Sequence, residues 1–452
     1  MKIVLIRPKY NSHIITPPLG LGYLSEYLKK AGVETIIIDA LRDSKIQTSV
    51  CAEVDKIKPD FVGITCLTAF YEETVCLAKE LKNKGYKVGI GGVHPTFLPY
   101  QTLVDSQVDF VFCGEGEIAF SKLAKNNFVN NGIQGVYSLE NLKSENDSII
   151  NGEIVIDLDE LPFPNWEQIN PNSYPRAPHG ALVKNFPIGV VMTSRGCTYE
   201  CTFCASPGFY GRRIRFRSPE NVVAEIELLV KKYGVKEIHF EDDNLTLVRD
   251  KVENLCRLLI KKKINITWAC PNGIRADKVD QDLIRLMKES GCYYFSYGIE
   301  SANPQILKNI KKREKISDIE KAITIASEEG IDCQGFFIFG LPGETQETIR
   351  ESIDFAKNSK LSRAQFLLLD VLPGSALWTD LKGKFVPNWQ KNSYKEPEWL
   401  PIGISKDLLL KAQSTAFREF YFRLKIAFRL LRLVNYKQIK FILKRLFEYR
   451  II

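Results

Sequence analysis

Short apolar runs rich in Val and Ile alternate with helical patterns along most of this 452-residue chain. Runs such as KIVLI (2–6), ETIIID (34–39) and DFVGIT (60–65) are long enough for strands buried on both faces. Buried strands of that kind, separated by helices, form parallel sheets that helices cover on both sides. The pattern therefore predicts an α/β fold.

Residues 1–135 are predicted to form one doubly wound, Rossmann-like domain. Further strands are expected over 87–92 and 109–114, and helices over 21–30 and 72–83. Ligands of such sheets lie at the carboxyl ends of the strands, where glycines let the backbone approach a ligand closely. Four loops with glycine or threonine follow the expected strands, at 16–22, 65–68, 91–96 and 114–117.

The rest of the chain is predicted to contain a linker, a second α/β domain and a helical end. Residues 136–182 include the proline-rich stretch LDELPFPNWEQINPNSYPRAPHG and are expected to be irregular. Residues 183–390 carry six expected strands, which predicts a partial (β/α)6 TIM-type barrel rather than a closed eight-stranded one. Residues 391–452 are expected to be a basic helical region. The six strands are expected over 187–194, 236–241, 265–270, 293–299, 332–340 and 363–371.

Three cysteines lie close together directly after the first strand of the second domain. Cys197, Cys201 and Cys204 fall within eight residues, so their thiolates can bind one metal centre together. Iron–sulfur clusters normally take four cysteines, and three would leave one iron open to a ligand from outside the protein. A zinc ion is the alternative to an iron–sulfur cluster, but structural zinc sites have four protein ligands. The remaining cysteines are scattered, which is a poor disulfide framework and typical of a cytoplasmic protein.

The CxxxCxxC loop, placed after a first barrel strand, resembles that of radical S-adenosylmethionine (SAM) enzymes. The resemblance extends to the subfamily in which a cobalamin-binding domain precedes the barrel. That subfamily contains the anaerobic cyclase of bacteriochlorophyll synthesis and many methyltransferases. The segments that resemble it are PPLGLGYLSEYL, GGVHPTFLP, VDFVFCGEGE, LDELPFPNW, FEDDNLT, GIES (298–301), FGLPG (339–343) and LPGSALW (372–378).

The resemblance implies a 4Fe–4S cluster on the three cysteines, with SAM bound to the fourth iron. In the family, reduction of the cluster cleaves SAM to methionine and a 5′-deoxyadenosyl radical, while the protein orients the cofactors and excludes water. Phe203 is expected to lie against the adenine, and Arg275 to pair with the SAM carboxylate. An acidic group at 241–243 would receive the SAM ammonium. Glu300 and Ser301 are expected to contact the ribose or the methionine end of SAM. The complete set of SAM-site candidates is Phe203, Glu241, Asp242, Asp243, Arg275, Glu300 and Ser301.

The resemblance also implies bound cobalamin in the first domain. The familiar DxHxxG signature, whose histidine ligates cobalt, is absent, and the subfamily commonly lacks it. We therefore expect cobalamin with no histidine on cobalt, and with His94 either near the corrin or hydrogen-bonded inside the domain. The cobalamin-site candidates are Pro18, Leu19, Gly20, Thr65, Thr68, Gly91, Gly92, His94, Gly114, Glu115 and Gly116.

The motifs are compatible with three functions. The first is a methyltransferase that methylates an unactivated carbon of a substrate that the sequence does not identify. The second is a cyclase or oxidoreductase that uses the same cofactors without methyl transfer. The third, a sensor of corrinoid or iron–sulfur without turnover, would not need the barrel and its SAM site. Either enzyme would require a small-molecule or lipid-linked substrate, and an electron donor such as flavodoxin or ferredoxin.

The positive charge of the chain is concentrated at its end. Residues 417–452 hold ten Lys or Arg against two Asp or Glu, which accounts for the whole net charge of +8. Basic residues interleaved with Phe, Leu and Ile at helical spacing are typical of a helix on an anionic membrane surface. Packing on the barrel is the alternative. No nucleic-acid-binding module is recognised, and the expected location is cytoplasmic or peripheral to a membrane.

Overall fold

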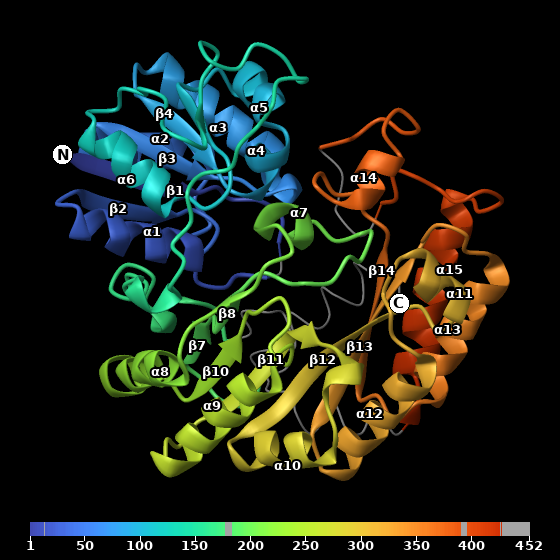
Figure 1. Ribbon diagram of the computed structural model, residues 1–452. Helices are drawn as coiled ribbons and strands as arrows, with labels where there is room; N and C mark the ends of the chain where they lie inside the picture. Colours follow the sequence, from blue (N-terminus) through green and yellow to red (C-terminus); the bar gives the residue numbers. More distant parts are fainter. Residues whose placement is uncertain (13, 177–182, 390–395, 425, 427–452) are drawn as a thin grey trace. The chain divides into compact units, whose positions relative to one another are not determined.

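The computed structural model describes residues 1–12, 14–176, 183–389, 396–424 and 426, which fall into two compact α/β units (Figure 1). The first unit comprises Met1–Pro175 and the described residues of 388–391. The second comprises the other described residues. Each unit contains one six-stranded sheet within the described part of the chain, and the α/β fold predicted above is therefore confirmed.

The first unit is a doubly wound sheet in the strand order β2-β1-β3-β4-β5-β6. Its first five strands are parallel, and β6 joins antiparallel to β5. The order reverses between β1 and β3, the place where ligands of such sheets bind. The elements are β1 (Lys2–Arg7), α1 (Leu19–Lys30), β2 (Glu34–Asp39), α2 (Gln47–Ile57), β3 (Phe61–Thr65), α3 (Tyr71–Asn83), β4 (Val88–Gly91), α4 (Val93–Phe97), α5 (Pro99–Ser106), β5 (Phe110–Phe112), α6 (Glu117–Lys125) and β6 (Val136–Tyr137).

Alternate side chains of the first sheet pack into the helices on its two faces. Val4, Ile64 and Ile90 lie in a buried cluster with residues of α2, α3 and α5. On the other face, the Phe61 ring packs edge-on against Phe120 of α6. Burial on both faces explains why these strands are nearly continuous apolar runs in the sequence.

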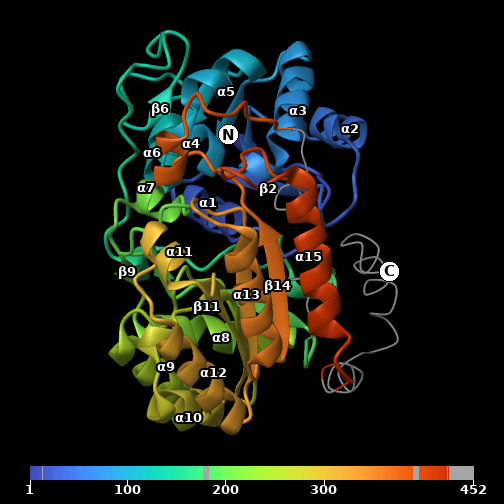
Figure 2. The same ribbon diagram turned by 90° about the vertical axis from the view of Figure 1, so that its right-hand side faces the viewer.

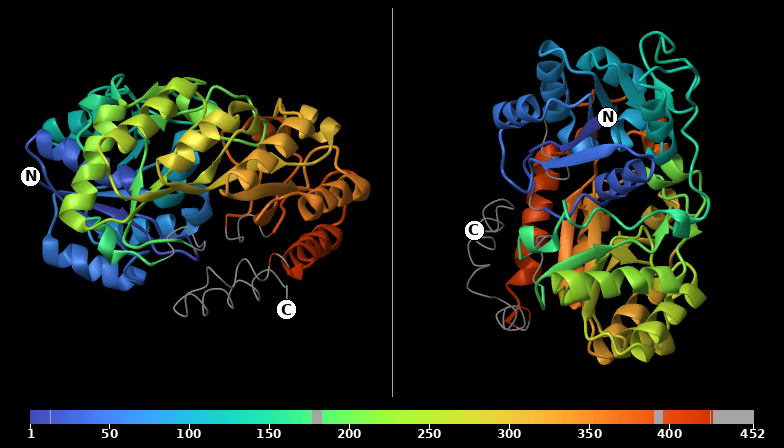
Figure 3. Two further views of the ribbon diagram at one scale, coloured as in Figure 1. Left: turned by 90° about the horizontal axis from the view of Figure 1, so that it is seen from below. Right: turned by 90° about the vertical axis from the view of Figure 1, so that its left-hand side faces the viewer.

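The second unit is a partial barrel with its parallel strands in sequential order, β7-β10-β11-β12-β13-β14. The connecting helices lie outside the strands (Figures 1 and 3). The elements are β7 (Ile188–Val191), β8 (Ser194–Arg195), α7 (Ser206–Tyr210), β9 (Arg215–Phe216), α8 (Pro219–Tyr233), β10 (Glu237–Phe240), α9 (Arg249–Lys261), β11 (Thr267–Ile274), α10 (Gln281–Glu289), β12 (Cys292–Glu300), α11 (Pro304–Asn309), α12 (Ile316–Glu328), β13 (Asp332–Phe339), α13 (Gln346–Asn358), β14 (Arg363–Leu368), α14 (Ala376–Asp380) and α15 (Lys406–Tyr421).

Side chains cover the backbone of the edge strand in each sheet. At β2, the Gln168 amide accepts a hydrogen bond from the Ile37 N–H (2.6 Å) and donates one to the Thr35 carbonyl (2.9 Å). At β14, the Tyr421 hydroxyl bonds both backbone groups of Ala364 (3.1 and 2.7 Å). An uncovered edge would offer unpaired backbone groups to another chain, so these contacts protect one edge of each sheet.

The helix α15 packs along the last strand of the barrel (Figure 2). Its Phe417 ring meets Phe366 of β14 edge-on at 5.3 Å, and its Gln413 amide donates to the Phe366 carbonyl. The predicted helical end of the chain is thus packed on the barrel over 406–421. Most of the tail that is predicted to contact a membrane follows this helix, and of that part the structure describes residues 422–424 and 426. Residue 425 and residues 427–452 lie outside the described residues. No described helix is long and apolar enough to cross a membrane.

A chain that ends after Ser405 should lose stability, because it uncovers Phe366 and the edge of β14. We expect the free energy of unfolding of the barrel to fall by more than about 3 kcal/mol, the usual cost of deleting one buried Phe. A chain that ends after Ile426 keeps α15 and should unfold at the same denaturant concentration as the full chain. Equal midpoints for all three chains in urea titrations would contradict this assignment of α15.

Candidate cluster and cofactor sites

The three cysteines lie in a loop that a short antiparallel hairpin closes. The hairpin pairs β8 with β9, Ser194 opposite Phe216. It was not expected from the sequence, which predicted a single strand over 187–194. Gly196 turns the chain out of β8 with a φ of +99°. A Cβ there would overlap the carbonyl oxygen of Arg213, so this turn requires glycine.

Backbone hydrogen bonds hold the centre of the cysteine loop against two other parts of the barrel. The Thr202 N–H donates to the carbonyl of Ile310 (3.0 Å), after α11. The Thr202 carbonyl accepts from the N–H of Leu377 (2.8 Å) in α14. Thr202 lies between Cys201 and Cys204, so these bonds fix the positions of the two thiols.

The segment that receives Thr202 alternates between exposed and buried side chains. Lys312 and Glu314 are buried, while Lys311, Arg313 and Lys315 are exposed. The Lys312 ammonium lies 3.0 Å from Glu300 and 3.5 Å from Glu314. Burial alone would lower the pKa of Lys312, but the two carboxylates raise it above its ordinary value, so the lysine remains charged. Sequence reasoning missed Lys312 and Glu314, because all five residues over 311–315 are charged and nothing in their pattern marks two of them as buried.

Arg275, a predicted partner of the SAM carboxylate, lies after β11 and holds this same segment. Its guanidinium donates to both oxygens of Asp277 and to the carbonyls of Lys312 (2.8 Å) and Arg313 (3.1 Å). It also stacks over the ring of Tyr199 in the cysteine loop, 3.7 Å from the ring centroid. Arg275 therefore ties the cysteine loop to the end of β11, and its pairing with SAM stays a prediction.

Glu300 and Ser301 lie at the end of β12, the place where the sequence predicts contacts to SAM. Glu300 is 6% exposed and has a φ of +64°, a conformation that residues other than glycine rarely adopt. Burial raises the pKa of Glu300, and Lys312 counteracts the shift. Gly298 leaves room for this pair, because a Cβ there would lie 2.6 Å from the Glu300 carboxylate. Ser301 is fully buried and faces Ser352 of α13.

The three acidic residues after β10 have different surroundings. Asp242 is fully buried, and its carboxylate accepts from the backbone and hydroxyl of Thr193, next to β8. Asp243 accepts from the Ser206 hydroxyl at 2.9 Å. Glu241 is partly exposed. Asp242 and Asp243 thus anchor the two ends of the cysteine loop, and the predicted contact of this trio with SAM is untested, as is that of Phe203.

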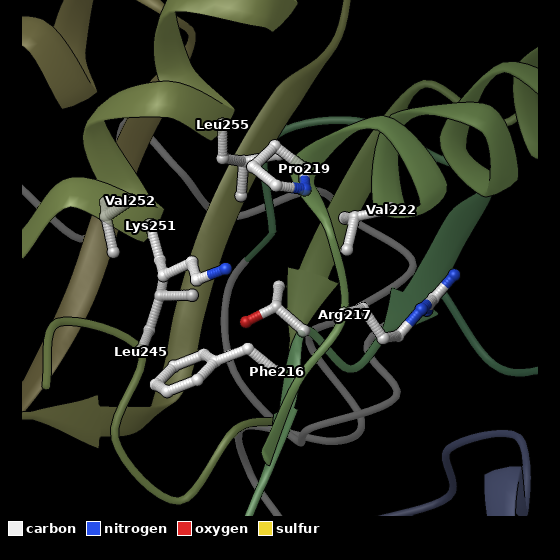
Figure 4. Close-up of a pocket in the computed structure, with 9 residues that line it drawn as sticks. Phe216, Arg217, Pro219, Val222, Leu245, Lys251, Val252 and Leu255 are labelled. Carbon is white, nitrogen blue, oxygen red and sulfur yellow. The ribbon is translucent and has the colours of Figure 1, made fainter. Parts of the chain in front are cut away.

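One cavity in the barrel is too small for a cofactor. It has a volume of about 10 Å³, room for about one water molecule. It is lined by Phe216 of β9, by Leu245 from the loop after β10, and by side chains of α8 and α9 that include Val252 (Figure 4). It lies under the hairpin and belongs to the packing of that hairpin on its helices.

The donor set of the cysteine loop fits an iron–sulfur cluster. All three cysteines are partly exposed and form no disulfide. Burial raises the pKa of the Cys204 thiol to about 12 and shifts Cys197 and Cys201 in the same direction. Among the described residues, no three His, Cys, Asp or Glu side chains are arranged around a single ion. Three thiols on one loop are the donor type that iron–sulfur clusters take.

The loops predicted to hold cobalamin meet at the carboxyl edge of the first sheet. Gly92 has a φ of +115°, and a Cβ there would lie 2.5 Å from the Cys66 carbonyl oxygen. Thr96 links two of the loops, because its hydroxyl donates to the Gly92 carbonyl and accepts from the Gly114 N–H. Gly20 and Gly116 have open space where a Cβ would lie. Gly92 and Gly114 thus allow the loops to pack closely, whereas Gly20 and Gly116 leave free surface at the edge.

His94 lies inside an aromatic cluster at this edge. Its ring stacks on Tyr71 with centroids 4.0 Å apart and meets Trp389 edge-on at 5.0 Å. Nδ1 bonds the Thr68 hydroxyl, and Nε2 is buried without a hydrogen-bond partner. Burial lowers the pKa of His94 to about 3, so the imidazole is neutral. The His94 ring is thus buried and hydrogen-bonded inside the domain, and its contact with the corrin stays a prediction.

Family models match both halves of the chain. A model of the radical SAM superfamily matches residues 191–356, and a model of the B12 binding domain matches residues 10–124. An uncharacterized methyltransferase of Pyrococcus horikoshii is 31% identical, with 94% of each chain covered. A cytidylyl-2-hydroxyethylphosphonate methyltransferase of Streptomyces wedmorensis is 29% identical, over 83% of this chain and 80% of its own. An anaerobic magnesium-protoporphyrin IX monomethyl ester cyclase of Rubrivivax gelatinosus is 28% identical, over 93% and 77%.

Solved structures share the fold of this chain. The radical SAM methyltransferase TsrM from Kitasatospora setae, with tryptophan substrate and a SAM analogue bound, has a TM-score of 0.72 and 19% identity over 97% of this chain and 90% of its own. The cobalamin-dependent SAM radical enzyme OxsB, with aqua-cobalamin bound, has a TM-score of 0.74 and 18% identity over 99% and 70%. The chain belongs to the radical SAM superfamily, among the enzymes that use a 4Fe–4S cluster, SAM and a B12-binding domain.

Proposed function

We propose that this enzyme transfers a methyl group to an unactivated carbon of a small-molecule substrate. The observation that carries the proposal is the methyltransferase relative that is 31% identical along 94% of both chains. A second relative that is named as a methyltransferase matches this chain over 80% of its own length. Substrates cannot be carried over at these identities, so the proposal names the reaction and leaves the substrate open.

In this family, the cluster and SAM supply the radical that takes a hydrogen atom from carbon, and cobalamin supplies the methyl group. The chain's own residues hold these groups and limit access of water. Cys197, Cys201 and Cys204 would bind the cluster on a loop that Thr202 fixes to the barrel. Glu300 would face SAM at the end of β12. The loops at 16–22, 65–68, 91–96 and 114–117 would hold cobalamin.

Cyclisation or oxidation without methyl transfer is the second candidate. The cyclase relative from Rubrivivax gelatinosus supports it, with 28% identity over 93% of this chain. Both reactions consume SAM through the same cluster, and both need an electron donor and a small substrate. They differ in the fate of the methyl group of SAM, which an assay without substrate can follow.

The basic end of the chain would bring the enzyme to an anionic membrane surface. Each Lys or Arg near such a surface contributes about 1 kcal/mol, so ten of them suffice for reversible binding. Eight of the ten lie outside the described residues, whereas Arg418 and Arg423 lie at the end of the described chain. Membrane binding would favour a lipid or lipid-linked substrate.

Reduced enzyme loaded with cobalamin should form S-adenosylhomocysteine from SAM before any substrate is added. A methyltransferase moves the methyl group of one SAM onto its corrinoid, whereas a cyclase forms only 5′-deoxyadenosine. We expect about one S-adenosylhomocysteine for each bound corrinoid, and none in enzyme prepared without cobalamin. Formation of 5′-deoxyadenosine alone, measured by chromatography, would favour the cyclase.

Replacing Cys197, Cys201 or Cys204 by Ala should abolish both the visible absorbance of the cluster and the reductive cleavage of SAM. A matched control is Cys76→Ser, which changes an exposed cysteine on α3 and should leave both signals intact. Iron content, absorbance and 5′-deoxyadenosine are measured under anaerobic conditions. Reductive cleavage by a triple-Ala protein would show that the cluster lies elsewhere.

Replacing His94 by Phe should leave the axial ligation of cobalt unchanged, because His94 is enclosed by Tyr71 and Trp389. Phe keeps the ring contact with Tyr71, so the domain should still fold. Paramagnetic resonance of the cob(II)alamin protein should show no nitrogen splitting in either form. A splitting in the original protein that disappears in His94→Phe would identify His94 as the cobalt ligand.

Liposome binding tests the membrane proposal for the tail. Full-length protein should sediment with anionic vesicles and much less with neutral ones, and added salt should release it. The chain that ends after Ile426 should remain in the supernatant with both kinds of vesicle. Negligible binding of the full-length protein to anionic vesicles would exclude a membrane role for the tail.

A further inference from the structure

The surface beside the cysteine loop is strongly basic. Residues 207–215 and 308–315 together contain eight Lys or Arg and one Asp or Glu. Over residues 1–416 positive and negative charges balance, because the excess charge of the chain lies in its last segment. The positive charge at the cysteine loop is therefore a local feature of the barrel.

These two basic segments meet at a cavity that leads from the cysteines to solvent. The cavity has a volume of about 270 Å³ and is lined by Cys201, Cys204, Arg212 and Lys311, among others. Arg212 and Arg313 both pair with Glu200, so one carboxylate offsets two guanidinium groups. Lys308 and Lys311 are exposed and have no ion pair among the described residues. We name Arg212, Lys308, Lys311 and Arg313 the basic rim.

The side chains of the basic rim face solvent rather than an enclosed pocket. Arg212 is 62% exposed and Arg313 is 66% exposed. A small anion held in a built site would contact buried donors, whereas exposed charges act at a distance on a large surface of opposite sign. The arrangement thus favours a macromolecule with an acidic face over a small charged ligand.

The chemistry of the cluster requires such a partner. Its reduction takes one electron from outside the chain, and electron transfer becomes rapid only where the donor comes close to the cysteines. Transient redox complexes have small interfaces and depend on complementary charge for encounter. The cavity with its basic rim is the described surface at which both conditions are met.

We propose that the basic rim docks an acidic electron-transfer protein, a reduced flavodoxin being the probe of choice, over the cavity at Cys201 and Cys204. The donor loses one electron and the cluster gains it, with no bond formed or broken. The proposal rests on the cluster and not on methyl transfer, so it stands or falls separately from the reaction proposed above.

The test compares cluster reduction in Lys308→Glu/Lys311→Glu with that in the original protein. Both positions are exposed and lie outside the Glu200 pairs, so the cysteine loop should keep its structure. The matched control is Lys261→Glu/Lys321→Glu, which makes the same change of charge on exposed positions of α9 and α12. Bleaching of the cluster is followed by stopped flow with reduced flavodoxin and, separately, with photoreduced deazariboflavin, which is small and uncharged.

At low ionic strength, the rim variant should be reduced by flavodoxin roughly tenfold more slowly than the original protein. The control variant should behave like the original protein, and deazariboflavin should reduce all three equally. High salt should remove most of the difference, because it screens exposed charges. Equal rates with flavodoxin would overturn the proposal. An equal loss with both reductants would overturn it too, because the lysines would then support the loop. Inhibition by millimolar phosphate at constant ionic strength would assign the rim to small anions instead.

Discussion

The hydrogen bond between Thr202 and Ile310 is the contact on which the cluster site depends. It places the cysteine loop on the segment that carries Lys312 and Glu314, and that segment is held in turn by Arg275. The buried charges are two bases and two acids in mutual contact, so each has a partner that offsets the cost of its burial. Removing one member would leave an uncompensated buried charge that acts on Cys201.

The cysteine loop reaches the ends of several strands through different interactions. Asp242 and Asp243 hold its two ends from β10, and Arg275 stacks on Tyr199 from β11. Cofactor chemistry at the carboxyl face of a barrel needs a loop that stays in place when its metal is reduced. Several anchors from separate strands provide such a support without any rigid element inside the loop. The same loop remains open to solvent at the cavity, which Arg212 and Lys311 of the basic rim line.

The sequence predicted the strands well, because strands buried on both faces leave an uninterrupted apolar signature. It also located the cysteine loop, since three thiols at that spacing have few structural uses. Lys312 could not be found in this way, because a run of charged residues ordinarily lies in solvent, and only the contact with Glu300 explains its burial. Asp242 is predicted to receive the SAM ammonium, and this contact stays a prediction; within the chain its carboxylate accepts from Thr193 and Ser194. An acidic residue at a strand end indicates a polar site, but its partners depend on the tertiary fold.

The electronic structure of the reduced cluster, with and without SAM, tests the central claim most directly. Three cysteines leave one iron open, so the paramagnetic resonance spectrum of the reduced cluster should change when SAM is added. The change should require SAM and should not occur with adenosine, which lacks the amino and carboxylate groups of SAM, added at the same concentration under the same reducing conditions. A spectrum that SAM leaves unchanged, in protein containing four irons per chain, would show a fully ligated cluster and contradict the account.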